Sequence, residues 1–225
     1  MKQIWKHKKI VLFTGACIYL FVSATISFNQ YIEPRLKAQA KTQVNMALND
    51  LVSMIIVDME YDSSDFFLIE TDHDGNVTSV QYNTKLLNQL LYQSLQRIDD
   101  SVEAASMGKT DPNLHKVLFP DGIIYEMPLG YLSGIGFLQD VGPSIPIRMK
   151  LLHDVSGDLK VNTKSLGINM TQIEVVLDVS IQAQAITSLS VEEIDIHASV
   201  PLIMQLVNGE VPPYAPYPSF SNSKK

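Results

Sequence analysis

The order of apolar and polar positions divides the chain into an uncharged first segment, two amphipathic stretches and a C-terminal part with strict alternation. Residues 10–28 contain no acidic or basic residue and no Asn or Gln. At a rise of ~1.5 Å per residue, a helix of this length nearly crosses the ~30 Å hydrocarbon layer of a membrane. The pattern therefore predicts one transmembrane helix over residues 10–28, preceded by a short basic segment, residues 1–9.

The charges that flank this predicted anchor predict its orientation. Four lysines precede it: Lys2, Lys6, Lys8 and Lys9. The positive-inside rule places such a segment in the cytosol and the rest of the chain on the other side. We therefore expect a single-pass cell-membrane protein with a cytoplasmic N-terminus and an extracytoplasmic C-terminal domain. A cleavable signal peptide is the alternative, because small residues near Ala24 suit a signal peptidase.

A helix, a hairpin and a second helix are predicted after the anchor. Apolar residues three and four apart predict a helix that starts at Glu33 and Pro34 and runs to Met59. Residues 66–70 and 77–82 are typical of two strands joined by an Asp-Gly turn. Asn83 is expected to cap a second helix that ends near Gly108. Leu114 to Met127 should add strand, broken by a turn at Pro120, Asp121 and Gly122.

The remaining segment alternates apolar and polar residues, which indicates antiparallel strands. From Ile145 to Leu151 the alternation predicts one strand, and Ser156, Gly157 and Asp158 predict a turn before a return strand. Ile173 to Ala185 alternates completely, and Val191 to Val207 does so less cleanly, with Pro201 expected to interrupt the ladder. An extended proline-rich stretch should follow to residue 218.

The predicted fold class is α+β: an N-terminal transmembrane helix, then a helix-hairpin-helix module on a small sheet, then an antiparallel β-rich region. The corresponding segments are 1–9, the basic cytosolic N-terminus; 10–28, the anchor; 29–127, the α/β module; 128–218, the β-rich region; and 219–225, a disordered tail.

Charge and composition exclude several classes of function. The net charge is −7, all 24 acidic residues follow the predicted anchor, and no cluster of Lys and Arg is present there, so nucleic-acid binding is not expected. The one cysteine, Cys17, lies in the anchor, which excludes disulfides and thiolate catalysis beyond it. The five histidines are far apart in sequence, and no Gly-x-Ser-x-Gly elbow occurs. We expect no enzyme activity, no metal site and no cofactor.

A glycine-rich segment, Gly130 to Pro143, stands apart because it combines flexible residues with bulky apolar ones. Ile135, Phe137 and Leu138 lie among its glycines. Two interpretations remain open. These side chains plug the core, or they form an exposed apolar loop that touches a partner or the outer leaflet of the membrane.

Residues of this segment and beyond carry a family resemblance. They are Gly134, Gly136, Asp140, Val141, Gly142, Pro143, Ile145, Pro146 and Arg148, then Gly167, Ile168 and Asn169, then Gly209, Val211 and Pro212. Together they resemble the sporulation protein YunB family of endospore-forming Firmicutes, most densely over residues 130–217. The chain departs from that pattern at Met170 and at the doubled proline, Pro212 and Pro213, as a distant member would.

The resemblance implies a protein of the mother-cell membrane that contributes to spore formation, and it transfers no catalytic residue. The leading hypothesis is a non-enzymatic scaffold that binds other sporulation or envelope proteins, or a second copy of itself, through the helix-hairpin-helix module. The alternative is a module that binds lipid or cell-wall glycan in a groove between the long hairpin and the apolar loop. The candidate interaction residues are Gly134, Ile135, Gly136, Phe137, Leu138, Asp140, Gly142, Pro143, Arg148 and Asn169.

Overall fold

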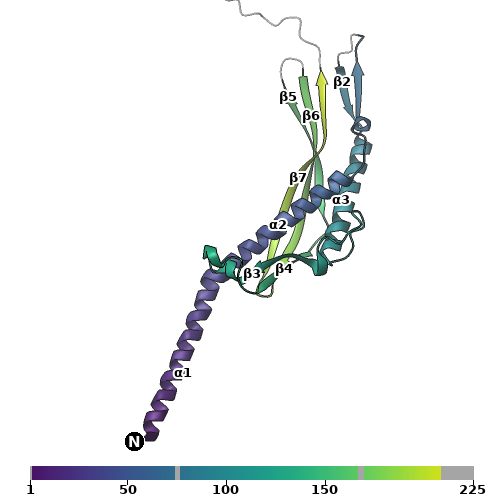
Figure 1. Cartoon of the computed structure of the whole chain (residues 1–225). Helices are drawn as coiled ribbons and strands as arrows, with labels where there is room; N and C mark the ends of the chain where they lie inside the picture. Colours follow the sequence, from purple (N-terminus) through teal and green to yellow (C-terminus); the bar gives the residue numbers. More distant parts are fainter. Residues whose placement is uncertain (1, 74–76, 167–169, 209–225) are drawn as a thin grey trace, which may run out of the picture. The chain divides into compact units, whose positions relative to one another are not determined.

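The chain begins with a helix that runs without a break into the folded part. A computed structural model describes residues 2–73, 77–166 and 170–208, with side chains from residue 13 on except that of Ala24. Helix α1 (Lys2–Ser27) is followed by one π-helical turn, η1 (Phe28–Ile32), and by helix α2 (Glu33–Asp58). In the wider turn the N–H of Glu33 donates to the carbonyl oxygen of Phe28. Figure 1 shows α1 leading directly into α2.

The transmembrane helix predicted over residues 10–28 is not confirmed by this structure. Within the part of the chain that is described, no helix is long and apolar enough to cross a membrane. The side chains of residues 10–12 and of Ala24, which belong to the predicted span, lie outside the described residues. The anchor therefore stays a prediction.

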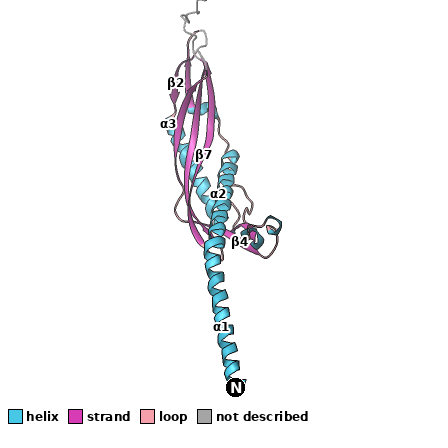
Figure 2. Ribbon diagram, turned by 90° about the vertical axis from the view of Figure 1, so that its left-hand side faces the viewer, coloured by secondary structure: helices cyan, strands magenta, loops and turns pink. Residues whose placement is uncertain are grey.

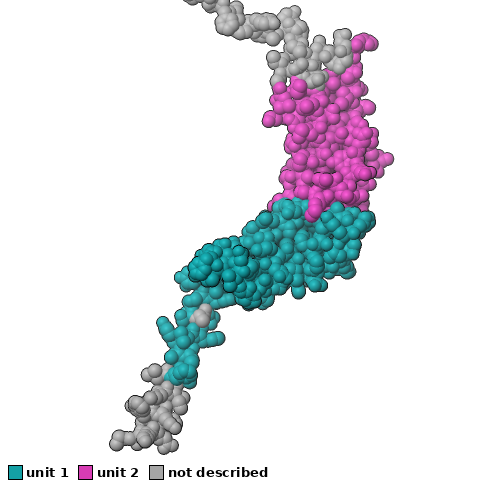
Figure 3. Space-filling model, viewed as in Figure 1, with its two compact units in different colours: residues 1–52, 98–155, 181–196 teal, residues 53–97, 156–180, 197–225 magenta. Residues whose placement is uncertain are grey.

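The chain divides into two compact units, which we describe separately (Figure 3). Unit 1 comprises residues 1–52, 98–155 and 181–196, and unit 2 comprises residues 53–97, 156–180 and 197–225. Helix α2, helix α3 (Thr84–Ser106), strand β6 (Met170–Ile186) and strand β7 (Val191–Asn208) each contribute residues to both units.

Unit 1 is built on the first part of α2 and on the strand pair β3 (Ile123–Pro128) and β4 (Ser144–Leu151). These strands are antiparallel, and β4 also pairs with the end of β6 from Arg148↔Ile186 to Leu151↔Ala183. The α2 stripe predicted from the threes and fours of the sequence is buried here. Fully buried side chains of the unit include Leu36, Leu48, Leu51, Ile98, Met127, Ile147, Ile181 and Ile194.

Unit 2 contains the predicted hairpin, which is confirmed as strands β1 (Phe67–Thr71) and β2 (Val77–Tyr82). The residues of its Asp-Gly turn, 74–76, lie outside the described part. The predicted cap is confirmed as well, since Asn83 Oδ1 accepts the N–H of Leu86 at 3.3 Å at the start of α3. Strand β5 (Ser156–Ser165) pairs antiparallel with the first part of β6.

The strands confirm the predicted antiparallel, β-rich second half. Their order is β3-β4-β6-β5, and β7 also pairs with β6. Figure 2 shows the long strands side by side. Alternation in the sequence predicts the inward face of β6 correctly, because all seven expected residues are buried: Ile173, Val175, Leu177, Val179, Ile181, Ala183 and Ala185.

The turn predicted at Ser156, Gly157 and Asp158 is wrong, because all three residues belong to β5. Gly157 pairs with Val179. A Cβ added to Gly157 would overlap the carbonyl oxygen of Asp178 and lie 3.0 Å from Leu95 Cδ2. The glycine therefore permits a close approach within the sheet and does not mark a turn.

Two further expectations differ from the structure. Between Leu114 and Phe119 the predicted strand is reduced to one bridge, Thr110↔Val117. Pro201 does not end β7, which continues to Asn208. The buried side chains of β7 stand at even-numbered positions up to Leu202 and at odd-numbered positions from Ile203 on. β7 is paired with β6, and a proline is tolerated in a strand where its missing N–H is not needed. The proline-rich stretch and the tail, residues 209–225, lie outside the described residues.

Candidate functional site

The glycine-rich segment forms a closed loop between β3 and β4, residues 129–143, here called loop 129–143. Its two ends are joined by backbone hydrogen bonds. The N–H of Leu129 donates to the carbonyl oxygen of Pro143 at 3.0 Å, and the N–H of Gly130 donates to that of Val141 at 2.9 Å. These bonds continue the ladder of β3 and β4, whose last pair is Pro128↔Ser144.

Short-range hydrogen bonds and one tightly packed glycine fix the loop internally. Ser133 Oγ donates to the carbonyl oxygen of Gly130 at 2.7 Å and accepts the N–H of Ile135 at 3.1 Å. The N–H of Val141 donates to the carbonyl oxygen of Leu138 at 3.0 Å. A Cβ added to Gly130 would overlap the carbonyl oxygens of Leu138 and Val141, so no other residue fits without moving the backbone.

Side chains from the first two turns of α2 hold the loop from one side. Arg35 Nη1 donates to the carbonyl oxygen of Leu132 at 3.1 Å, and the Tyr131 hydroxyl donates to Gln39 Oε1 at 3.1 Å. Gly134 has a φ of +72°, and an added Cβ would overlap the Arg35 guanidinium. An open cleft of about 330 Å³ remains between loop and helix, lined by Arg35, Ala38, Gln39, Thr42, Tyr131, Gly134 and Gln139.

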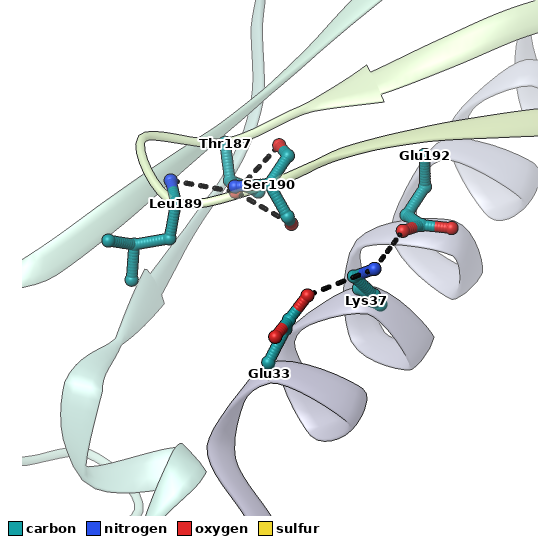
Figure 4. A network of polar contacts seen from close by, with 6 residues as sticks. All are labelled: Glu33, Lys37, Thr187, Leu189, Ser190 and Glu192. Carbon is teal, nitrogen blue, oxygen red and sulfur yellow. Dashed lines mark hydrogen bonds and ion pairs between the residues drawn. The ribbon is translucent and has the colours of Figure 1, made fainter. Parts of the chain in front are cut away.

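A second segment of unit 1, the turn between β6 and β7, is also fixed beside the start of α2 (Figure 4). Lys37 Nζ lies 2.7 Å from Glu192 Oε1 and 3.1 Å from Glu33 Oε1. Hydrogen bonds to Glu192 and then to Glu33 raise the pKa of Lys37, so its ammonium group stays charged in this network.

The turn itself is closed by the Thr187 hydroxyl group together with one backbone hydrogen bond. Thr187 Oγ1 accepts the N–H of Ser190 at 2.9 Å and that of Leu189 at 3.3 Å, and the N–H of Thr187 donates to the carbonyl oxygen of Ser190 at 2.9 Å (Figure 4). Threonine and serine hydroxyls typically stabilise turns in this way. Leu189 is therefore held in a defined position.

Both segments direct apolar side chains outward. Phe137 is 82% exposed, and Ile135 and Val141 of the same loop are exposed too. Leu189 and Val191 are exposed at the turn between β6 and β7. The interpretation that Ile135 and Phe137 plug the core is therefore wrong. Of the three bulky residues Ile135, Phe137 and Leu138, only Leu138 is half-buried. Contact with a partner or with the outer leaflet stays a prediction.

The structure brings together most of the candidate interaction residues. Loop 129–143 contains eight of them: Gly134, Ile135, Gly136, Phe137, Leu138, Asp140, Gly142 and Pro143. Arg148 lies apart from the loop on β4, where it pairs with Ile123 and Ile186. Asn169 lies outside the described residues.

Sequence reasoning missed the residues that hold these segments in place. They are Arg35, Gln39, Tyr131, Thr187 and Glu192, whereas Gly130 was named only as the first residue of the glycine-rich segment. Arg35 and Gln39 appear in the sequence only as polar positions of an amphipathic helix, which gives no signal of a long-range contact. Thr187, Leu189 and Ser190 lie between two alternating segments, which is the signal of a tight turn.

A polar groove of about 500 Å³ lies in unit 2 on strands β5, β6 and β7. It is lined by Ser156, Gly157, Asp158, Lys160, Asp178, Val179, Ser180, His197, Ala198 and Ser199. Asp178 accepts hydrogen bonds from Lys160 and from Ser199. Lys160 first and Ser199 second lower the pKa of Asp178, and Asp178 in turn raises the pKa of Lys160. Across the described residues, no three His, Cys, Asp or Glu side chains gather as a metal site.

The comparisons with known proteins agree with the resemblance in the sequence. A family model described as sporulation protein YunB matches residues 124–214, which include loop 129–143 and most of strands β3 to β7. The chain is 25% identical over 203 residues to sporulation protein YunB of Bacillus subtilis (strain 168), which covers 88% of this chain and 78% of that protein. No solved structure matches. The resemblance to the YunB family is thereby confirmed, and it supports a role in sporulation.

Proposed function

We propose that this chain, similar over most of its length to sporulation protein YunB, acts in sporulation as a membrane-tethered, non-enzymatic scaffold outside the cytosol. In this proposal residues 10–28 span the mother-cell membrane. The two units bind other sporulation or envelope proteins, or a second copy of the chain.

The observation that carries the tether is the exposure of the apolar side chains of α1. Each of the following is between 48% and 75% exposed: Phe13, Ile18, Tyr19, Leu20, Phe21, Val22 and Ile26. Apolar surface of this extent is unfavourable in water, by roughly 25 cal/mol per Å². Together with the uncharged run from residue 10 to residue 28, it favours a helix whose surroundings are lipid.

The scaffold role is supported by apolar side chains that the helix-hairpin-helix part of unit 2 leaves exposed. Val57 on α2, Leu68 and Tyr82 on the hairpin, and Tyr92 on α3 are all exposed. Contacts between proteins are enriched in tyrosine and other large apolar side chains. A partner that covers this surface would remove it from water.

The tether is tested with the only cysteine of the chain, Cys17. In intact vesicles carrying the full chain, we expect a membrane-impermeant maleimide to leave Cys17 unlabelled until detergent is added. The control is Tyr92→Cys in a Cys17→Ser background, because position 92 is exposed in unit 2 and should be labelled from the extracytoplasmic side. Labelling of Cys17 in intact vesicles as fast as the thiol of this control variant would refute the tether.

The sporulation role is tested by counting heat-resistant spores of a host that lacks the gene. We expect a large loss that the full chain restores and that a secreted version without residues 1–28 does not restore. The variants Leu68→Asp and Tyr92→Asp, at exposed positions, should fold but restore fewer spores than the matched Leu68→Ala and Tyr92→Phe. An unchanged count in the deletion strain would sink the proposal.

A second candidate function, glycan binding, is favoured by the polar groove of unit 2. The groove is lined by serine hydroxyl groups, by the ammonium group of Lys160 and by the carboxylates of Asp158 and Asp178. Such groups form hydrogen bonds with sugars. The groove residues belong to unit 2 and loop 129–143 to unit 1, so the groove is formed without the apolar loop that the sequence reasoning had included. Titration of the detergent-solubilised full chain with soluble cell-wall glycan should show binding that Asp178→Asn weakens. Absence of binding would remove this candidate.

A further inference from the structure

Loop 129–143 and the turn between β6 and β7 both lie at the start of α2. The loop is held by Arg35 and Gln39, and the turn by Lys37 through Glu192. Figures 1 and 2 agree in placing the loop beside the junction of α1 and α2. Two segments more than forty residues apart in sequence are thus fixed at one level of the same helix.

That level is close to the end of the proposed membrane span. Phe28 is the last residue of the span, and Arg35 follows it by about seven residues, which is ~10 Å of helix. The headgroup layer on each side of the ~30 Å hydrocarbon core is several Å thick, for a total of about 40–45 Å. A helix that leaves the hydrocarbon core at Phe28 along the membrane normal therefore places Arg35 a few Å beyond the headgroup layer and both segments at the membrane surface.

Five large apolar side chains are exposed at this level beside polar ones such as Gln139, Asp140 and Glu193, and the supports of the apolar ones are rigid. The apolar side chains are those of Ile135, Phe137 and Val141 of the loop and Leu189 and Val191 of the turn, here called the apolar collar. Gly130, Ser133 and Thr187 fix the backbone beneath them. Because this backbone is already ordered, little further ordering is needed when the Phe137 side chain enters an apolar medium.

We propose that the apolar collar enters the outer leaflet of the membrane around the point where the chain emerges. The proposal rests on the tether proposed above, and it assigns to loop 129–143 a lipid contact. Loop 129–143 carries one charged residue, Asp140, so the loop's part of the contact is largely apolar, whereas Val191 at the turn is followed by Glu192, which pairs with Lys37, and by the exposed Glu193. Tyr31 and Tyr131, both exposed, lie at the same level and have the amphipathic character that suits the membrane interface.

The continuity of the helix favours lipid over a protein partner. A protein partner for the collar would have to occupy the space next to the anchor at the membrane surface, where lipid is already present. The net charge of −7 and the scarcity of charge on the loop also predict a contact that does not depend on anionic lipid or on salt.

The test uses tryptophan fluorescence of the full chain reconstituted in phosphatidylcholine vesicles, some of whose lipids carry bromine atoms near the headgroup. The only tryptophan of the chain is first removed by Trp5→Phe. In that background Phe137→Trp and, separately, Leu189→Trp report on the two parts of the collar. Val161→Trp is the control. Val161 is exposed like the collar residues, but it lies on β5, where it pairs with Val175 in the first half of β6, and it is not part of the collar.

The proposal expects the tryptophans introduced at positions 137 and 189 to lose most of their fluorescence to brominated lipid and to emit at shorter wavelength, at low and high salt alike. The tryptophan of the Val161→Trp control should be unaffected. If both collar reporters are unquenched while Cys17 is protected from aqueous maleimide, the collar does not touch lipid and the tether stands. If Cys17 is labelled, the tether fails and this inference fails with it. Two reporter positions keep the test decisive if one variant does not fold.

Discussion

Strand β6 and loop 129–143 are both rich in apolar residues and both have hydrogen-bonded backbones, but they place their apolar side chains differently. In β6 every second side chain is buried, and packing of these side chains fixes the strand. In the loop the backbone is fixed by hydrogen bonds and by the absence of a side chain at Gly130, while Ile135, Phe137 and Val141 face outward. An apolar residue therefore stabilises the fold in the first region and is available for contacts in the second.

The largest effect that would sharpen this comparison is expected in β6. Ile181 is fully buried, so Ile181→Ala should lower the free energy of unfolding by about 2–5 kcal/mol through lost burial and the cavity left behind. Urea denaturation of the full chain in detergent, followed by circular dichroism, measures this change.

The matched substitution in the loop is Phe137→Ala. Because the ring of Phe137 is exposed, we expect the free energy of unfolding to change by less than about 0.5 kcal/mol, although a larger side chain is removed. The same variant should restore fewer heat-resistant spores than the unchanged chain. A loss of stability equal to that of Ile181→Ala would break the comparison.

The loop backbone should respond to a much smaller change. Gly130→Ala inserts a methyl group where two carbonyl oxygens lie, and we expect a loss of about 1–3 kcal/mol or a local opening of the loop. Gly136→Ala is the control, because nothing lies within 4 Å of its added Cβ. Denaturation together with limited proteolysis measures both outcomes. Equal behaviour of the two variants would mean that Gly130 does not fix the loop.

A smaller effect is expected at the turn between β6 and β7. Thr187→Val keeps the shape of the side chain but removes the acceptor for the N–H groups of Leu189 and Ser190, so we expect a loss of about 0.5–1.5 kcal/mol. Thr187→Ser keeps the hydroxyl group and should be close to the unchanged chain. Thermal denaturation of the three proteins ranks them; a valine variant as stable as the serine variant contradicts the role given to the hydroxyl.

The smallest effect concerns pH and the outer face of β6. Lys160 and Ser199 lower the pKa of Asp178 below its unfolded value of about 3.9. A carboxyl group whose pKa is lowered by folding stabilises the folded chain above the unfolded value, and this contribution is lost as pH falls through the folded value. Between neutral pH and pH ~3, the urea midpoint of the unchanged chain should therefore fall slightly more than that of Asp178→Asn. Parallel curves would show that the pair adds nothing.

Periodic segments of the fold were predictable from the sequence, because burial repeats there at the period of the backbone. The α2 stripe, the Asn83 cap and the inward face of β6 follow from local spacing alone. The turn predicted at Gly157 is wrong, because glycine is needed there for the close approach of Asp178 and Leu95, which are distant in sequence. Pro201 was misread because the pairing of β7 with β6 is a property of the whole sheet.

Less of the candidate site was predictable. The glycine and apolar content of residues 130–143 singled out the right segment and left two interpretations open. Exposure of Phe137 decides against the core, and it depends on how Arg35 and Gln39 hold the loop, which no local pattern shows. The contribution of Leu189 could not be seen before the turn was placed beside Lys37.

The π-helical turn at Phe28–Ile32 has a consequence for changes of chain length. Such a turn holds one residue more than an α-helical turn, so deletion of one residue here would convert it to regular α-helix. Because the wider turn takes up its extra residue within one turn, α1 and the buried stripe of α2 would keep nearly the same facing relative to each other after such a deletion. Proteins similar to this chain that differ by a single inserted or deleted residue at this point would therefore share both the folded units and the side of α1 that faces a neighbour.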